Sequence, residues 1–113
     1  MKYSTDVKDN ILFINLEGDL LGESNGIELV DVVNDKINDS LLLCAINLSQ
    51  VRYMNSSGIG VLITLLTKFR NKGGEVILIN PSDQKKKLLI ITKLNAIFNI
   101  VENEEQAVSQ LKK

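Results

Sequence analysis

The sequence predicts an α/β domain with a mixed, largely parallel sheet of four to five strands, packed by about four helices. Short apolar runs alternate along the chain with longer segments of helical periodicity, which is the pattern of strands joined by helical crossovers. One run, Leu41–Leu48, is apolar almost throughout, as in a strand buried on both faces of a covered sheet. The length of 113 residues, without repeats or linkers, predicts a single domain over residues 1–113.

Two strands and a helix are predicted in the N-terminal third of the chain. Tyr3–Lys8 is a short mixed run that suits an edge strand. Ile11–Glu17 alternates apolar with polar side chains, which is typical of a strand, and Gly18-Asp19 is expected to end it. A helix is expected from Ser24, a candidate N-cap, to Asn38-Asp39-Ser40. Its apolar residues recur at helical spacing, at Ile27, Val30, Val33 and Ile37.

Residues 59–69 carry the clearest helical pattern in the chain. Apolar side chains recur there at i, i+3, i+4, i+7 and i+10, which predicts one stripe facing the core. The stripe consists of Ile59, Leu62, Ile63, Leu66 and Phe69. A loop that carries Tyr53 and Met54 is expected to join the strand Leu41–Leu48 to this helix, and Gly73-Gly74 is expected to end the helix.

Two short strands and two helices are predicted in the C-terminal third. The strands are Val76–Ile79 and Ile97–Val101. A helix is expected to begin at Ser82 and to end at Asn95, with Leu88 and Ile91 facing inward. A closing helix is expected from Asn103 through Leu111, where Gln106 forms a capping pair with Asn103.

Composition and charge exclude several classes of function. The chain holds 13 Lys and Arg against 14 Asp and Glu, a net charge of −1, so it lacks the basic surface of a nucleic-acid binder. Lys85-Lys86-Lys87 is interpreted as a solvated helix face. With no histidine and one cysteine, neither a metal site nor a cofactor is expected, and Cys44 is interpreted as a small buried hydrophobe.

The sequence also bears on where the protein works. The N-terminal residues lack the apolar core of a signal peptide, and no apolar run reaches transmembrane length. A single cysteine cannot form a disulfide within the chain, which suits a reducing compartment. A cytoplasmic protein that does not insert into a membrane is therefore expected.

The segment Asn55-Ser56-Ser57-Gly58 joins a strand to a helix, and it has a structural and a functional interpretation. Structurally, Asn55 or Ser56 caps the helix, and Gly58 and Gly60 let its first turn approach neighbouring backbone. Functionally, a serine at a helix N-terminus is well placed to carry a phosphate, because unpaired N–H groups and the helix dipole favour negative charge there.

Catalytic and nucleotide-binding interpretations of this segment are weak. The pattern around Ser56 is not Gly-x-Ser-x-Gly, and the chain has no histidine to act as a base. No Gly-Lys-Ser/Thr follows a glycine loop, and Ile63 stands where a dinucleotide fingerprint requires its third glycine. The chain is therefore not expected to be an enzyme.

Taken together, the order of elements and three short segments resemble a STAS domain, and in particular a stand-alone bacterial anti-sigma factor antagonist. The segments are Met54-Asn55-Ser56-Ser57-Gly58-Ile59-Gly60-Val61, Gly73-Gly74-Glu75 before a strand, and Glu104-Glu105-Gln106-Ala107-Val108. The resemblance covers essentially all 113 residues.

The resemblance implies a phosphorylation-dependent partner switch. Family members usually have Asp-Ser-Ser/Thr-Gly at this point, and the first hydroxyl residue is phosphorylated, which places the acceptor at Ser56, with Ser57 as the alternative. The kinase is an ATP-binding anti-sigma factor, the unphosphorylated antagonist binds it and frees the sigma factor, and a serine phosphatase resets the cycle. Residues expected to contact the partner are Asn55, Ser57, Gly58, Ile59, Val61 and Leu65, with Lys68 beside them.

Several alternatives stay open at this point. Val61 and Leu65 are equally consistent with positions at the flank of the core. Asn55 replaces the usual Asp, and Gly18–Glu23 departs from the usual Gly-Glu-Leu/Ile-Asp. These departures leave room for a STAS adaptor subunit of a transport or signalling complex that has no phosphorylation cycle. A nucleotide or lipid sensor is a third interpretation, although no phosphate loop supports it.

Overall fold

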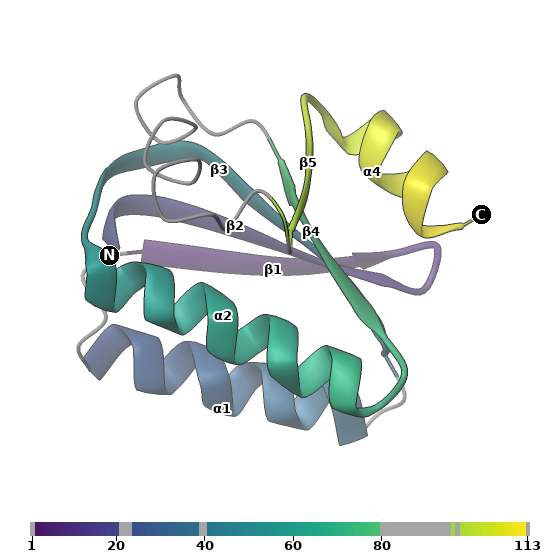
Figure 1. Ribbon diagram of the computed structural model, residues 1–113, viewed down its shortest axis with the longest axis horizontal. Helices are drawn as coiled ribbons and strands as arrows, with labels where there is room; N and C mark the ends of the chain where they lie inside the picture. The colour runs from purple at the N-terminus through teal and green to yellow at the C-terminus, as the bar shows by residue number, and fades with distance from the viewer. Residues whose placement is uncertain (1, 21–23, 39–40, 80–95, 97, 113) are drawn as a thin grey trace.

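A computed structural model describes residues 2–20, 24–38, 41–79, 96 and 98–112 of the chain. Five strands and three helices lie within these residues (Figure 1). They are β1 (Lys2–Lys8), β2 (Ile11–Leu20), α1 (Ser24–Asn38), β3 (Leu43–Met54), α2 (Ser56–Asn71), β4 (Glu75–Ile79), β5 (Asn99–Val101) and α4 (Glu104–Leu111). The helix predicted to begin at Ser82 lies outside the described residues.

The strands form one mixed sheet in the order β1-β2-β3-β4-β5. β1 and β2 are an antiparallel hairpin, and the other neighbours are parallel. The hairpin turn places Asp9 and Asn10 at φ values of 53° and 63°, and two consecutive positive φ angles are what a type I′ turn requires. The α/β class with a mixed, largely parallel sheet is thus confirmed.

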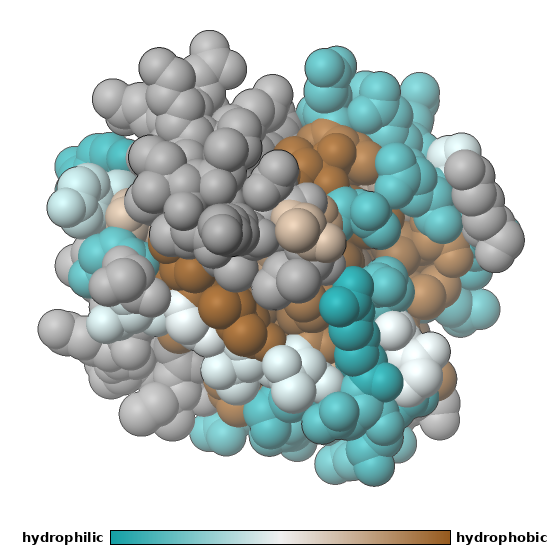
Figure 2. Space-filling model, viewed as in Figure 1, coloured by the Kyte–Doolittle hydropathy of each residue, from teal (hydrophilic) through white to brown (hydrophobic). Residues whose placement is uncertain are grey.

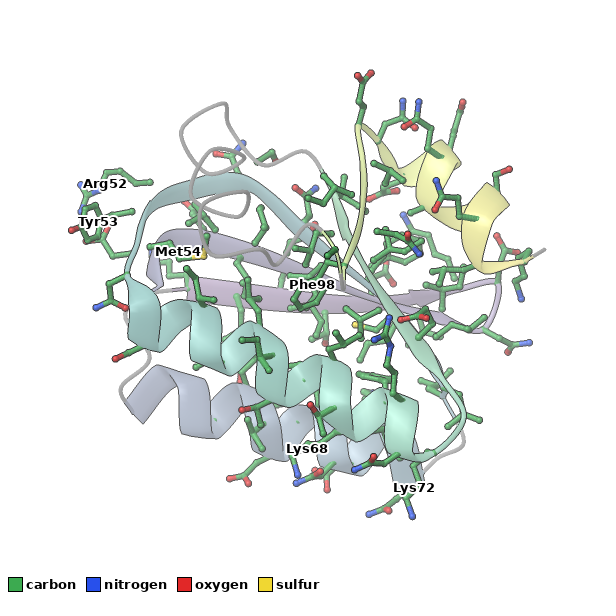
Figure 3. The ribbon with its side chains drawn as sticks, viewed as in Figure 1. Arg52, Tyr53, Met54, Lys68, Lys72 and Phe98 are labelled. Carbon is green, nitrogen blue, oxygen red and sulfur yellow. The ribbon has the colours of Figure 1, made fainter. Side chains whose placement is uncertain are left out.

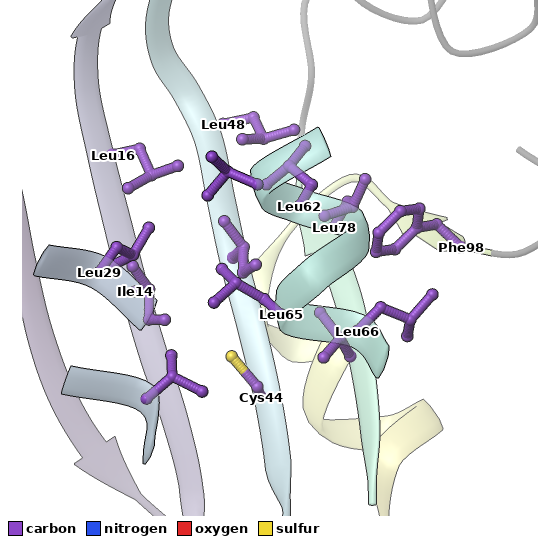
Figure 4. Packing of buried hydrophobic residues seen from close by; sticks show 14 of the residues in the cluster. Ile14, Leu16, Leu29, Cys44, Leu48, Leu62, Leu65, Leu66, Leu78 and Phe98 are labelled. Atoms are coloured by element: carbon purple, nitrogen blue, oxygen red, sulfur yellow. The ribbon is translucent and has the colours of Figure 1, made fainter. Parts of the chain in front are cut away.

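Helices cover both faces of the sheet, with α1 and α2 on one face and α4 on the other (Figure 1). The larger apolar cluster lies under α1 and α2 and includes Leu29, Leu62 and Leu65 (Figure 4). The smaller cluster lies under α4 and includes Ile11 and Phe13. The first residues of β2 are therefore buried on both faces, and the polar alternation predicted for this strand begins only at Asn15 and Glu17.

Cys44 lies in the larger cluster with no exposed surface, as the sequence predicts for a small buried hydrophobe. Burial raises the pKa of its thiol well above the ordinary value, because the thiolate would lose its hydration in the apolar interior. The thiol of the folded protein is therefore protonated and unreactive.

β3 is longer than predicted, and its second half is irregular. The strand continues through Tyr53 and Met54, which were expected in a loop. Its register with β2 shifts twice, and each shift adds one residue to β3. Because each added residue turns the following side chains over, the buried residues of this half fall at every third position, at Leu48, Val51 and Met54. That spacing does not resemble a strand in sequence.

α2 ends where the sequence predicts, at Gly73-Gly74. The N–H of Gly74 donates to the carbonyl of Phe69 at 2.7 Å and that of Gly73 to Arg70 at 3.0 Å, which is the Schellman pattern, with Gly73 at φ +81°. A Cβ on Gly74 would collide with the carbonyl oxygen of Leu42. The two glycines therefore turn the chain tightly from the helix into β4.

Candidate functional site

The N-terminus of α2 is built by the cap that the sequence predicts. Asn55 has extended backbone angles, and its side-chain Oδ1 accepts a hydrogen bond from the N–H of Gly58 at 2.8 Å. Its backbone carbonyl accepts the N–H of Ile59 at 3.0 Å. Asn55 therefore begins the helix and occupies the amide of Gly58, while Ser56 and Ser57 are the first two helical residues.

The electrostatics of this helix end suit an added anion. The first turn of α2 holds no acidic residue. Four amides at a helix start lack helical partners, and only some of them are satisfied by a cap, so partial positive charge remains there. Ser57 is exposed and Gly58 is buried, so the turn presents its second serine to solvent and its glycine to the core. A phosphate on this turn would meet favourable backbone dipoles.

The burial pattern of α2 corrects the predicted partner surface. Leu65 has no exposed surface, and Val61 and Ile59 are 9% and 5% exposed. All three belong to the larger apolar cluster, so Val61 and Leu65 do not lie away from the core, and their interpretation as core positions is the one that holds. Conversely, Ile63 was predicted to face the core and is 37% exposed, because it lies at the edge of the apolar stripe.

The exposed face of α2 is uncharged along most of its length. It carries Ser57, Gly60, Ile63, Thr64 and Thr67, and we call these five residues the neutral face. Figure 2 shows pale and brown surface over this part of the helix, whereas strongly hydrophilic residues gather at its C-terminal end. Exposed faces of helices in soluble proteins ordinarily carry Lys and Glu, so a neutral face is unusual.

The threonines make the neutral face more apolar than its composition suggests. The hydroxyl of Thr64 donates to the carbonyl of Gly60 and that of Thr67 to the carbonyl of Ile63, both at 2.9 Å. These bonds turn the hydroxyls back onto the helix. Gly60 adds to the open character of the surface, since a Cβ there would meet no atom within 4 Å. The prediction that Gly60 allows close contact with neighbouring backbone is therefore wrong.

Basic residues mark the two ends of α2 (Figure 3). Lys68 lies in the last turns of the helix and Lys72 is its C-cap, both on the side of α1. At the N-terminal end, Tyr53 is 57% exposed and points outward beside Arg52, whereas Met54 is 5% exposed and points into the core. Tyr53 therefore adds an exposed aromatic side chain at the end of β3, shortly before α2 begins.

An ion pair beside the site was not predicted from the sequence. Arg52 donates from Nε and Nη2 to Oδ1 and Oδ2 of Asp19, at 3.0 and 2.8 Å. The two residues are 33 positions apart, and they meet because β2 and β3 are parallel neighbours whose ends lie together. Opposite charges near the ends of two predicted parallel strands were the available signal, but the second strand was expected to end at Leu48.

Comparison with known families identifies the fold. A sequence model described as the STAS domain matches residues 2–107. That match spans nearly the whole chain, so this protein belongs to the STAS domain family. The resemblance drawn from the residues of the α2 N-terminus is thereby confirmed at the level of the family.

Solved structures share this fold at low sequence identity. A protein from Thermotoga maritima is 20% identical and superposes with a TM-score of 0.89, over 98% of this chain and 95% of its own. The Bacillus cell fate determinant SpoIIAA in its phosphorylated form is 21% identical, with a TM-score of 0.75 over 96% and 98%. A sulfate transporter family protein from Wolinella succinogenes is 14% identical, with a TM-score of 0.80 over 95% and 88%.

Two further observations concern membranes and metals. Among the described residues, no helix is both long and apolar enough to cross a bilayer. The same residues contain no group of three or more Cys, Asp or Glu side chains arranged to hold a metal ion.

Proposed function

We propose that this protein is an anti-sigma factor antagonist that acts through a phosphorylation-dependent partner switch. The unphosphorylated chain binds an anti-sigma factor that is also a serine kinase, and this binding releases the sigma factor. Phosphate transfer from ATP to Ser56, with Ser57 as the alternative acceptor, ends the binding, and a serine phosphatase restores it. The antagonist catalyses no reaction itself, and it works in the cytoplasm.

The proposal rests mainly on the N-terminus of α2, where two consecutive serines follow the helix cap in a protein of the STAS domain family. Asn55 caps the helix, Ser56 is its first residue and Ser57 is exposed. A phosphate adds about −1.5 to −2 charges at pH 7, and a helix N-terminus accommodates that charge without unfolding. The charge and the size of the phosphate also weaken the binding of a partner protein at this surface. A loss of about 2–4 kcal/mol in binding lowers affinity roughly thirty- to a thousand-fold.

The neutral face and Tyr53 form the proposed docking surface, in place of the buried Ile59, Val61 and Leu65. The contacts predicted for Asn55 and Ser57 remain part of the proposal, whereas Gly58 is buried and its amide is bonded to Asn55. Exposed Ile63 lies near the middle of this surface, and its side chain is the natural apolar anchor. A face without charges loses little hydration on docking, so burying it against a partner is inexpensive.

The acceptor is tested with four baits expressed in the source cells: wild type, Ser56→Ala, Ser57→Ala and Ser56→Asp. Bound proteins and phosphate on each bait are identified by mass spectrometry. The expected result is phosphate on wild type and Ser57→Ala, none on Ser56→Ala, and a kinase-like ATPase that Ser56→Asp fails to retain. Ser109→Asp is the control, since it adds the same charge to an exposed position of α4. Undiminished phosphate on Ser56→Ala would reject this acceptor.

The docking surface has its own test, with a matched pair of variants. Ile63→Glu places a charge at the centre of the neutral face, where the residue is 37% exposed, and Val7→Glu does so on β1 at 44% exposed. Ile63→Glu is expected to weaken kinase binding at least tenfold, while Val7→Glu leaves it unchanged. Equal binding by both variants would exclude the neutral face.

A second candidate function is a STAS adaptor subunit that has no phosphorylation cycle. Asn55 in place of the family's usual Asp favours it, because the carboxylate beside the acceptor is missing. The similarity in fold to a sulfate transporter family protein also favours it. If all four baits retain the same transport-complex subunits and none carries phosphate, the adaptor function replaces the partner switch.

A further inference from the structure

The end of β3 that leads into α2 is paired less regularly with β2 than its beginning. In the described residues, pairing with β4 stops at Asn47 and Ile79, whereas pairing with β2 continues to Leu20 and Met54. The pairing with β2 is interrupted at both register shifts, one between residues 47 and 50 and one between residues 51 and 53 of β3. Within the described ranges, residues 48–54 therefore pair with β2 alone, through a ladder that is interrupted twice.

Arg52 is the residue that the second shift adds. Gly18 pairs with Val51 and Asp19 pairs with Tyr53, so Arg52 has no counterpart on β2. Gly18 has a φ of +91°, which bends β2 at the same place. Such a bulge re-aims the side chain of the added residue. Here the guanidinium of Arg52 meets the carboxylate of Asp19 through both oxygens.

The pair joins the two strands at the point where their backbone pairing is interrupted. Two parallel N–H···O bonds between ionised groups fix orientation as well as distance, which a single surface contact does not. These hydrogen bonds first, and the charge of Asp19 second, raise the pKa of Arg52 above its ordinary value. The side chain of Arg52 is 79% exposed and that of Asp19 is 31% exposed, so solvent reaches the pair.

We propose that the Arg52–Asp19 pair is a positioning device for the turn that carries the acceptor serines. Arg52 stands three residues before the cap Asn55, a span of at most about 11 Å of extended chain. Tyr53, which immediately follows Arg52, is in register with Asp19 itself. Fixing Arg52 to Asp19 therefore fixes the strand end from which α2 starts. That this turn receives a phosphate rests on the proposed function, whereas its positioning by the pair does not.

The positioning is tested on the isolated full-length chain by amide hydrogen exchange, followed by NMR at the hydrogen-bonded amides among residues 53–58, including that of Gly58. The variants are Arg52→Gln, Asp19→Asn and the double variant. Each single change is expected to speed exchange about three- to tenfold, since local opening becomes easier. The double variant is expected to exchange no faster than the single ones, because the same interaction is lost only once.

The matched control is Arg70→Gln, which breaks a similar ion pair at the other end of α2. Arg70 donates to Glu75 at 3.1 and 3.5 Å. This variant is expected to leave exchange at residues 53–58 unchanged. Wild-type exchange rates in Arg52→Gln, or effects that add in the double variant, would overturn the proposal.

A second readout separates the positioning from the proposed function. The rate at which phosphate fills Ser56 is measured in lysate, and Arg52→Gln is expected to be about threefold slower than Arg70→Gln, in line with its exchange. If Arg52→Gln exchanges faster than wild type but is phosphorylated at the same rate as Arg70→Gln, the pair does not position the acceptor serine for phosphorylation. Absence of phosphate on the wild-type chain would reject the proposed function and leave the exchange result to decide the positioning.

Discussion

The two halves of β3 pair with the same neighbouring strand, β2, in different ways. Residues 43–47 pair with β2 and β4 in unbroken register, and Cys44, Ala45 and Ile46 have no exposed surface. Residues 48–54 pair with β2 through two shifts, and four of the seven are exposed. The regular half stabilises the domain, and the irregular half carries the turn that leads into α2. One strand thus combines a regularly paired base with a bulged end, and we expect the bulged end to open more readily.

Cavity formation should separate the two halves most clearly. Ile46→Ala is expected to lower the free energy of unfolding by about 3–4 kcal/mol, because its surroundings are fixed on both sides and cannot collapse into the space. Met54→Ala, at the end of the irregular half, is expected to cost about 2 kcal/mol. Urea titration of both variants measures the difference. Equal losses would mean that the bulged half is packed as rigidly as the regular one.

Thiol labelling should show which half opens first. Cys44 in the regular half is expected to react with a thiol reagent only through global unfolding. Val51→Cys, made in a Cys44→Ala background, places a thiol at a position that is 6% exposed in the irregular half. For each variant, the labelling rate is divided by the global unfolding rate of that variant. This ratio is expected to be about tenfold higher for Val51→Cys than for Cys44, because local opening is enough to expose residue 51. If both thiols are labelled at the rate of global unfolding, the two halves of β3 do not differ in local opening.

Removing the cap that follows the irregular half should have a smaller effect. Asn55→Ala is expected to cost about 1 kcal/mol, because the amide of Gly58 loses its acceptor. Asn55→Asp keeps the acceptor, adds favourable charge at the helix start and should be at least as stable as wild type. Asn103→Ala is the matched control, because it removes the equivalent cap of α4, where Oδ1 of Asn103 accepts the N–H of Gln106 at 2.9 Å. The stabilities of the three variants are compared by thermal unfolding.

The smallest effect is a gain in stability. Gly60→Ala is expected to stabilise the domain by about 0.5–1 kcal/mol, since alanine favours the helix and its Cβ meets no atom within 4 Å. Gly73→Ala is the contrasting control, because its φ of +81° strains any L-residue. Chemical denaturation compares the two variants. If Gly60→Ala also weakens kinase binding, glycine at this position favours the partner at the expense of stability. If Gly60→Ala is instead less stable than wild type, a side chain at residue 60 is not free of contacts, and the surface there is not open.

What could be predicted from the sequence follows the same division. The regular half of β3, the helix α2 and its end at Gly73-Gly74 were predicted, because local propensity and periodicity agree there. The cap of α2 was predicted as Asn55 or Ser56, and it is Asn55. The capping pair of α4 was predicted in part: Asn103 caps the helix as expected, but Gln106 accepts the N–H of Glu102 rather than that of Asn103.

The predictions fail where the structure departs from simple periods. Bulges spaced the apolar residues of the irregular half by three, so Tyr53 and Met54 were assigned to a loop. α2 has so many apolar residues that more than one stripe can be drawn along it. The predicted stripe included Ile63, which is 37% exposed, and left out Leu65, which is buried. The Arg52–Asp19 pair depends on a long-range register that no local pattern reveals.

The two bulges also bear on how such a domain can diverge. Each bulge is an insertion of one residue that the sheet has absorbed without disturbing the core beneath it. Deleting one of them would draw the start of α2 back by about 3.3 Å, the rise of one strand residue. Adding another would push it forward by the same step. Single-residue changes in length at this strand end also turn over the side chains that follow them, so together with matching substitutions at positions such as Val51 and Met54 they can refit the helix to a different partner.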